Sequence, residues 1–271
     1  MQFSKKQQLK NYIKENLVSL KLNKCFKCKG NVRFVSFTSF QLICTRPLCK
    51  KKCSVFSNSI FKKFNKGIDN LIKLFELVFE SIKLCSISKI MHYNYRNLKK
   101  FMSNVNLYVK NNYNRFLDTI GGPGIVVEID ETKFGRRKYN RGHVVEGIWV
   151  LGMVERTADR RLVLIPVEKR DRNTLLALIK RHVAPGSIIH TDLWRGYTNL
   201  SEHFVHNTVN HSKWFVDEET GIHTNTIEGN WSYVKQNVYK KWRTKKNIWL
   251  PLAIVMAKRN GCLEEFLMNF L

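Results

Sequence analysis

Residues 125–132, IVVEIDET, predict a β-strand that carries acids toward its end. Residues 147–169, GIWVLGMVERTADRRLVLIPVEK, predict two more strands around a TADRR turn. Residues 172–183 predict a helix that ends before a Pro-Gly pair, and residues 187–192, SIIHTD, predict a short buried strand. This alternation of strands and helices favours a mixed α/β domain.

The charge of the chain indicates its partner. The 271 residues carry 47 Lys and Arg against 21 Asp and Glu, a formal charge of +26, which favours nucleic acid over an anionic membrane surface. Residues 1–120 hold 24 basic and 5 acidic side chains, whereas residues 121–271 hold 23 and 16. The first part is therefore expected to dominate electrostatic docking.

Localisation is predicted from the apolar segments. Lysines recur through the first residues and interrupt any signal peptide. The apolar run WLPLAIVMA, residues 249–257, is too short to span a bilayer. We expect an intracellular protein without a membrane partner, and a nuclear one if the host is eukaryotic.

Three acids of the α/β domain form a candidate metal site. Asp130 lies at the end of the first strand, Asp192 directly follows SIIH, and Glu228 lies in HTNTIEGNWSYVK, residues 223–235, which predict a helix. Loops gather polar groups at strand ends, and carboxylates there can hold Mg²⁺ or Mn²⁺. Three carboxylates around two such ions would supply what phosphoryl transfer needs.

Glu228 also has a structural alternative. Asn225 could be the N-cap of its helix, and Glu228, three residues on, could close a capping box. The packed face of this helix is predicted at Ile227, Trp231, Val234 and Val238. The neighbouring acids Glu128 and Glu131 are interpreted as solvated or structural.

Further residues near the acids are candidate auxiliaries. His190 and His223 could contact a scissile phosphate or position water, or they could be hydrogen-bonded structural histidines. Asn225 could orient Glu228 as well as cap the helix. Arg195 could line a DNA path, whereas Trp194 and Tyr197 are expected mainly to pack beside the sheet.

The cysteine spacing predicts a zinc ribbon. Cys25-x-x-Cys28 is a half-site, and Cys44, Cys49 and Cys53 compete for two remaining tetrahedral positions. Residues 31–43, NVRFVSFTSFQLI, alternate like a hairpin between the halves. We favour Cys25, Cys28, Cys44 and Cys49 as Zn²⁺ ligands with Cys53 as a spare. Cys85 and Cys262 are predicted to be core residues.

Helical spacing follows the ribbon over residues 65–110. A break is predicted at SIS, residues 86–88, before a second, basic helical segment with Arg96, Lys99 and Lys100. These helices could form a helix-turn-helix unit on DNA, or a linker with a solvated basic face. The predicted apolar face comprises Ile68, Leu71, Ile72, Phe75, Val78, Phe79 and Ile82.

A GGPG break at residues 121–124 sets the predicted domain boundary. We predict a zinc ribbon over residues 20–60, a helical DNA-binding segment over residues 61–120 and the α/β domain over residues 121–271.

The motifs VEIDET, HTDLWRGY, VNHS and HTNTIEGNW resemble the DDE transposase domain of the Merlin superfamily and of related bacterial insertion-sequence transposases. The resemblance covers about residues 122–243. It implies a ribonuclease H-like fold and a catalytic triad of Asp130, Asp192 and Glu228. The ribbon is also similar to family members, although the spacing of Cys44 and Cys49 departs from the commonest one.

This resemblance implies a DNA transposase that cleaves phosphodiester bonds at transposon ends and transfers the freed strand into target DNA. Terminal repeats and target DNA would be its partners, and the pairing of two ends implies a homo-oligomer. A transposase-derived DNA-binding regulator without activity, and a nuclease without strand transfer, are the alternatives.

Overall fold

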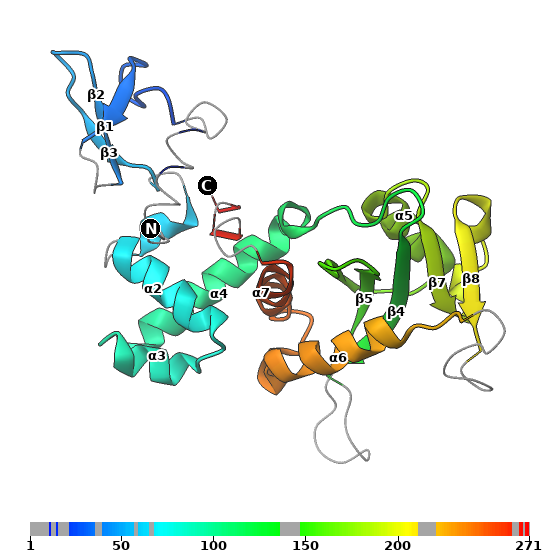
Figure 1. Cartoon of the computed structure of the whole chain (residues 1–271). Helices are drawn as coiled ribbons and strands as arrows, with labels where there is room; N and C mark the ends of the chain where they lie inside the picture. Colours follow the sequence, from blue (N-terminus) through cyan, green and yellow to red (C-terminus); the bar gives the residue numbers. More distant parts are fainter. Residues whose placement is uncertain are drawn as a thin grey trace. The chain divides into compact units, whose positions relative to one another are not determined.

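The computed structural model describes residues 11, 15, 22–35, 40–56, 59–64, 68–135, 147–210, 221–261, 266–267 and 269–270 (Figure 1). The chain forms two compact units, Met1–Val105 with Leu263–Leu271, and Asn106–Cys262. The three domain ranges expected from the sequence remain predictions.

The first unit begins with a small antiparallel sheet in the order β1-β2-β3. Its strands are β1 (Val32–Phe34), β2 (Gln41–Cys44) and β3 (Lys52–Ser54). The hairpin predicted over residues 31–43 is present as β1 and β2, with Val32 paired to Cys44. The third strand, which places Cys53 opposite Leu42, was not predicted.

Helices follow in this unit: η1 (Ile60–Lys63), α2 (Ile68–Phe79), α3 (Leu84–Ile90) and α4 (Tyr95–Asn111), the last of which crosses the boundary between the units. The predicted apolar face of α2 is buried at Leu71, Ile72, Phe75, Val78 and Phe79. Ile82 lies beyond the end of α2 and is exposed.

The predicted break at residues 86–88 is wrong, because these residues lie inside α3. Ile87 is fully buried there and favours the helix, whereas the flanking serines do not stop it. The chain breaks instead at Ser81 and His92, both of which have left-handed φ angles. Cys85, predicted to be a core residue, is exposed on α3, and Cys262 lies outside the described residues.

An aromatic cluster packs the helices of the first unit. Phe270 lies 5.0 Å from Phe61 and 5.9 Å from Phe75 between ring centroids, and Phe266 lies 5.2 Å from Phe79. The last residues of the chain therefore belong to the core of the first unit.

The second unit contains a five-stranded sheet in the order β6-β5-β4-β7-β8. Strands β6, β5 and β4 form an antiparallel meander, while β7 and β8 run parallel to β4. Four of these strands match the strands predicted from the sequence, and β8 was not predicted. The strands are β4 (Val126–Phe134), β5 (Ile148–Glu155), β6 (Leu162–Val167), β7 (Ile188–Asp192) and β8 (Val205–Val209).

Helices cover both faces of this sheet (Figure 1). Helix α5 (Arg172–His182) contributes Leu175 and Ile179 to the main core, together with Ile129 and Leu151 of the sheet. Helix α6 (Asn225–Asn237) packs on β4 and β5 from the other face, and α7 (Trp249–Asn260) packs on β6. Short 3₁₀ segments connect these elements: η2 (Tyr113–Phe116), η3 (Arg195–Tyr197), η4 (Leu200–Glu202) and η5 (Lys240–Trp242).

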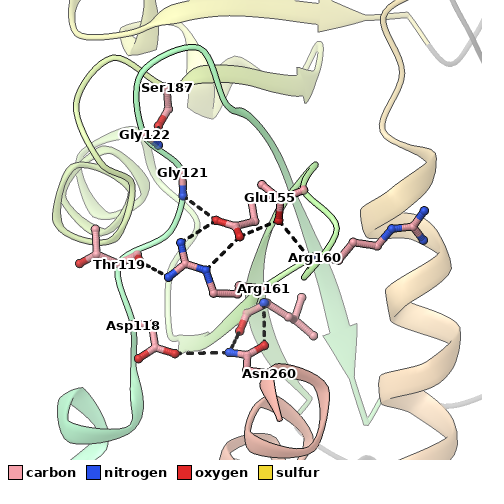
Figure 2. A network of polar contacts seen from close by, with 11 residues as sticks. Asp118, Thr119, Gly121, Gly122, Glu155, Arg160, Arg161, Ser187 and Asn260 are labelled. Carbon is pink, nitrogen blue, oxygen red and sulfur yellow. Dashed lines mark hydrogen bonds and ion pairs between the residues drawn. The ribbon is translucent and has the colours of Figure 1, made fainter. Parts of the chain in front are cut away.

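A polar network fastens the chain where it enters the sheet (Figure 2). The buried Glu155 carboxylate accepts two hydrogen bonds from the Arg161 guanidinium, each 2.9 Å long, and one of 2.9 Å from the backbone N–H of Gly121. The Gly122 N–H donates to Ser187 Oγ at 2.9 Å. The predicted GGPG break is therefore a fixed turn in this unit, tied to the β5–β6 hairpin.

No helix in the described part of the chain has the length and apolar character that crossing a membrane requires. The apolar run at residues 249–257 lies in α7, where Leu250, Leu252 and Val255 are buried.

Candidate active site

The register of the sheet places Asp130 beside Asp192. The last pair between the parallel strands β4 and β7 is Glu128 with His190, and each aspartate lies two residues further along its strand. Beyond that pair β4 continues against β5, with Asp130 opposite Gly152, and β7 continues against β8. The two aspartates therefore stand at the same level where β4 and β7 separate.

Glu228 reaches the same place from the first turn of α6, where its side chain is exposed. Burial raises the pKa of Asp130, and the negative charges of Asp192 and Glu228 raise it further. The charges of Asp192 and Glu228 thus act on Asp130, so the three predicted acids lie in one region of the fold. Such mutual repulsion is relieved when carboxylates share a cation, and carboxylate oxygens suit Mg²⁺ or Mn²⁺.

Trp231 and Gly152 hold Asp130 in place. The Trp231 indole N–H donates a 2.8 Å hydrogen bond to Asp130 Oδ2. A Cβ atom at Gly152 would lie 2.6 Å from the Trp231 ring, so only glycine leaves room for the indole at this position. The sequence predicted Trp231 only as a packed residue and gave no sign of Gly152.

Glu128 anchors the start of α6. Its fully buried carboxylate accepts a 2.9 Å hydrogen bond from the backbone N–H of Ile227 and a 2.5 Å hydrogen bond from Arg156 Nε. Arg156 also donates to the His223 carbonyl oxygen at 2.6 Å. Strand β4, the residue after β5 and the start of α6 are thereby joined directly beside Glu228.

Glu128 is therefore structural and not solvated. Glu128 and Asp130 are two residues apart and therefore share one face of β4, and this spacing was the available sequence signal. The sequence analysis missed Arg156. This residue directly precedes the TADRR turn, and no local pattern there indicates that its partner is Glu128 in β4.

The capping box expected for Asn225 and Glu228 is absent from this described helix start. The N-cap is Thr224, and the backbone N–H of Asn225 lies 3.3 Å from His223 Nδ1. The Glu228 carboxylate instead accepts a 3.2 Å hydrogen bond from the Thr224 hydroxyl. Glu128 and His223 thus accept the N–H groups of Ile227 and Asn225 at this helix start.

The two candidate histidines belong to the Glu128 cluster. His223 Nδ1 lies 3.5 Å from Glu128 Oε1, and His190 is buried on β7 in register with Glu128. Burial lowers the pKa of His190, and the positive charge of Arg156 lowers it further. This geometry favours the structural alternative for both histidines.

Hydrogen bonds from the segment that follows β7 reach Asp192 and Glu131. The backbone N–H of Trp194 donates to Asp192 Oδ1 at 2.9 Å, and the Tyr197 hydroxyl donates to Glu131 Oε1 at 2.6 Å. Burial raises the pKa of Glu131 to about 7, with contributions from Asp130 and Asp192. Tyr197 is buried in the core and Trp194 packs against it, as expected, while Arg195 is exposed.

A cationic cavity of about 430 Å³ lies on another side of α6. Arg160, Lys258 and Arg259 line it together with polar side chains and backbone of α6, including Asn225, and no carboxylate takes part. Figure 2 shows Arg160 extending toward that helix. The cavity is suited to an anion such as a phosphate group.

The second predicted site is a cluster of four thiols in the first unit. The Sγ atoms of Cys25, Cys28, Cys44 and Cys49 lie within 4.8 Å of one another. Cys25 Sγ is 3.8 Å from Cys49 Sγ, and Cys28 Sγ is 3.5 Å from Cys44 Sγ. A tetrahedral zinc site with Zn–S bonds of about 2.3 Å has S···S edges of about 3.8 Å, so these thiols fit Zn²⁺.

Backbone N–H groups favour the thiolate form in this cluster. A hydrogen bond from the Cys28 backbone lowers the pKa of Cys25 to about 7, and one from the Gly30 backbone lowers the pKa of Cys28. Burial raises the pKa of Cys44 to about 12, although the Arg46 backbone opposes this. Cys53 lies on β3 and is not one of the four, which favours Cys49 as the fourth ligand.

Residues 121–247 match the ISXO2-like transposase domain family. This part of the chain is therefore similar to ISXO2-like transposase domains. A protein of Haemophilus influenzae named as an uncharacterized transposase-like protein is 37% identical over 68 residues. Those residues are 25% of this chain and 54% of the relative, so the chain spans about half of that protein's length. Both findings support a transposase function.

The matched residues contain all five strands of the mixed sheet and helix α6. Asp130, Asp192 and Glu228 therefore lie inside it. The thiol cluster lies outside the matched residues.

Proposed function

We propose that the chain is a DNA transposase that cleaves phosphodiester bonds at transposon ends and joins the freed 3′-hydroxyl to target DNA. Asp130, Asp192 and Glu228 would be its catalytic carboxylates. The proposal is supported by the sheet register, which sets Asp130 and Asp192 at the same level of β4 and β7, and by the position of Glu228 in the first turn of α6, which packs on β4.

The same carboxylates would hold two Mg²⁺ or Mn²⁺ ions. When bound, these ions would offset the charge of the phosphate and stabilise the attacking and leaving oxygens. The protein's own contribution is positional: Trp231 orients Asp130, the Trp194 backbone orients Asp192, and Glu128 fixes the helix that carries Glu228. Preorganisation of this kind is what phosphoryl transfer requires of a protein.

We also propose a ribonuclease H-like fold for the transposase domain. Its support is the mixed sheet, in which an antiparallel meander continues into two parallel strands, with helices on both faces. The Cys25, Cys28, Cys44 and Cys49 cluster would hold one Zn²⁺ ion as part of a ribbon that binds DNA. Pairing of two transposon ends would require at least a homodimer.

Cationic side chains support DNA as the substrate. The chain has a formal charge of +26, and Arg160, Lys258 and Arg259 line a cavity on the helix that carries Glu228.

The test is incubation of the full chain with DNA that carries the element's two ends and an unrelated target plasmid, in Mg²⁺. We expect cleavage at the ends followed by joined products. Cleavage without joining would identify a nuclease, and binding without cleavage would identify a regulator derived from a transposase.

A further inference from the structure

The guanidinium of Arg170 lies between two indole rings. Its Cζ atom is 4.1 Å from the centroid of the Trp149 ring and 4.1 Å from the centroid of the Trp194 ring. The three residues come from separate segments: Trp149 from β5, Arg170 from the turn before α5, and Trp194 from the turn after β7. Both distances are within the range of a strong cation–π contact.

The surrounding packing fixes this stack. Trp149 pairs with Val167 and Lys133 in the sheet, and both indoles pack against the main core. A Cβ atom at Gly196 would lie 2.6 Å from Trp194 Nε1, so the Trp194 ring rests directly on Gly196. The guanidinium is therefore held in one plane before any ligand arrives, which lowers the entropy that binding would cost.

The hydrogen-bond donors of Arg170 remain unused. Among the described residues, no acceptor lies at hydrogen-bonding distance from this guanidinium and no carboxylate forms an ion pair with it. Arg156 and Arg161 of the same unit differ, because each donates to a buried carboxylate. A purely structural arginine would be expected to resemble those two.

The position of the stack relates it to the acids. Trp194, whose ring contacts Arg170, donates its backbone N–H to Asp192 at 2.9 Å. Two further cations flank the stack: Lys133 Nζ is 5.7 Å from the Trp149 ring centroid, and Arg195 Cζ is 5.8 Å from that of Trp194. Lys133, Arg170 and Arg195 thus form a row of cations along the stack of Trp149 and Trp194.

We propose that Arg170, held between Trp149 and Trp194, binds a backbone phosphate of the DNA strand that enters the acid site. The indole faces turned toward Arg170 are covered by it and cannot stack on bases, so the contact is with phosphate and independent of sequence. The planar guanidinium presents paired donors that match two phosphate oxygens. This proposal rests on the proposed function, since it takes DNA as the substrate.

The test measures the salt dependence of DNA affinity by fluorescence anisotropy. Full-length protein carrying Asp130→Asn keeps the DNA uncut in Mg²⁺, and Arg170→Gln is added to it. Loss of one phosphate contact is expected to reduce the slope of log K against log[salt] by about one. Two duplexes of unrelated sequence should show the same change.

Arg181→Gln is the matched control. It removes the same charge from an exposed position at the other end of α5, where the neighbouring His182 carbonyl oxygen accepts a hydrogen bond from the Ile120 N–H. Its salt slope should equal that of the parent protein. An unchanged slope for Arg170→Gln, with or without a lower melting temperature, would overturn the proposal in favour of packing alone.

Arg170→Lys keeps the test decisive if Arg170→Gln does not fold. Lysine retains the charge and lacks the planar pair of donors, so affinity should fall several-fold with little change in slope. Parent-like affinity for Arg170→Lys would then reject the phosphate contact. Absence of DNA binding by the parent protein would reject the proposed function itself, and this result is distinct from either variant's failure.

Discussion

At the scale of single residues, Glu128 and Glu228 are two acids near the start of α6 with different surroundings. Glu128 is fully buried and bonded to Arg156 and to the Ile227 N–H. Glu228 is exposed and acts on Asp130 through its charge. Burial with a fixed partner indicates a structural acid, whereas an exposed acid near other carboxylates is free to bind a cation, as we propose for Glu228.

Glu228→Gln separates these roles. Glutamine keeps the size of the side chain and can still accept the Thr224 hydroxyl, so folding should be almost unchanged. It removes the negative charge that a divalent ion requires, and we expect Mg²⁺-dependent DNA cleavage to fall by orders of magnitude. Gel assays of end cleavage measure this effect, with circular dichroism to verify the fold. Substantial cleavage by well-folded Glu228→Gln protein would remove this residue from the proposed site.

Glu128→Gln should instead lower stability. The change breaks the pair with Arg156 and places amide donors near a guanidinium, and we expect a loss of about 1–3 kcal/mol in the free energy of unfolding. Urea denaturation measures it. Glu168→Gln, at an exposed position after β6, is the matched control and should be within about 0.5 kcal/mol of the parent. Equal midpoints for the two variants would contradict the anchoring role of Glu128.

At the scale of elements, the fit of α6 against β5 sets the position of the acid site. The Trp231 ring lies over Gly152 and donates its N–H to Asp130, so the spacing between helix and strand also fixes the aspartate. A change in that spacing should affect stability and cleavage together.

Gly152→Ala tests this fit. The new Cβ atom would lie 2.6 Å from the Trp231 ring, so α6 must shift, and we expect a loss of about 1–3 kcal/mol in stability together with slower cleavage. Gly229→Ala is the control: it lies within α6 with open space around it, and it should stabilise the protein by up to about 1 kcal/mol. A Gly152→Ala protein as stable and active as the parent would show that the ring has room to move.

The thiol cluster gives a second prediction at this scale. Cys49→Ser should lose zinc, because it removes one of the four converging thiols, and the first sheet should unfold with it. Cys53→Ser should keep one zinc ion per chain. Elemental analysis of both proteins in reducing buffer measures the metal. If Cys49→Ser kept zinc and Cys53→Ser lost it, Cys53 and not Cys49 would be the fourth zinc ligand.

Local periodicity predicted most elements of the α/β unit. Strands β4 to β7 and helices α5 and α6 follow from apolar patterns and from the breaks beside them. Strand β8 was missed because its sequence, VHNTV, is mostly polar and only Val209 is buried. The start of α6 depends on Glu128, 99 residues before Ile227, and no local pattern records such a contact.

Several features of the site could not be predicted for the same reason. The three acids were found from their positions after strands and at a helix start, together with the family resemblance. Gly152, Arg156 and Arg170 matter through contacts with residues distant in sequence. The SIS error in α3 arose because serines were weighed as helix breakers without the burial of Ile87 between them.

At the scale of the whole molecule, charge differs between the two units. The unit Met1–Val105 with Leu263–Leu271 contains 22 basic and 6 acidic side chains, a net +16, whereas Asn106–Cys262 contains 25 and 15, a net +10. Both units carry a net positive charge suited to the proposed DNA partner, and the excess charge of the first should make the larger contribution to docking.

A fragment to test this division should begin at residue 106 and not at the GGPG turn. The Asn106 side chain donates to the Lys246 carbonyl oxygen at 2.8 Å and accepts from the Leu250 N–H at 3.1 Å. The Tyr113 hydroxyl donates to the Leu164 carbonyl oxygen, and its ring lies 5.1 Å from that of Trp249. A fragment starting at residue 121 would expose this buried surface of α7 and β6 and lose stability.

Residues 106–262 should therefore fold and bind DNA more weakly than the full chain, with a smaller slope of log K against log[salt]. The slope counts the phosphates that basic groups neutralise, and the fragment lacks residues 1–105, which hold 22 of the 47 basic side chains. Anisotropy titrations of both proteins on one duplex, over a series of salt concentrations, measure the difference. Equal slopes for a folded fragment would mean that the transposase domain makes all the phosphate contacts, with the charge of the first unit free to serve another partner.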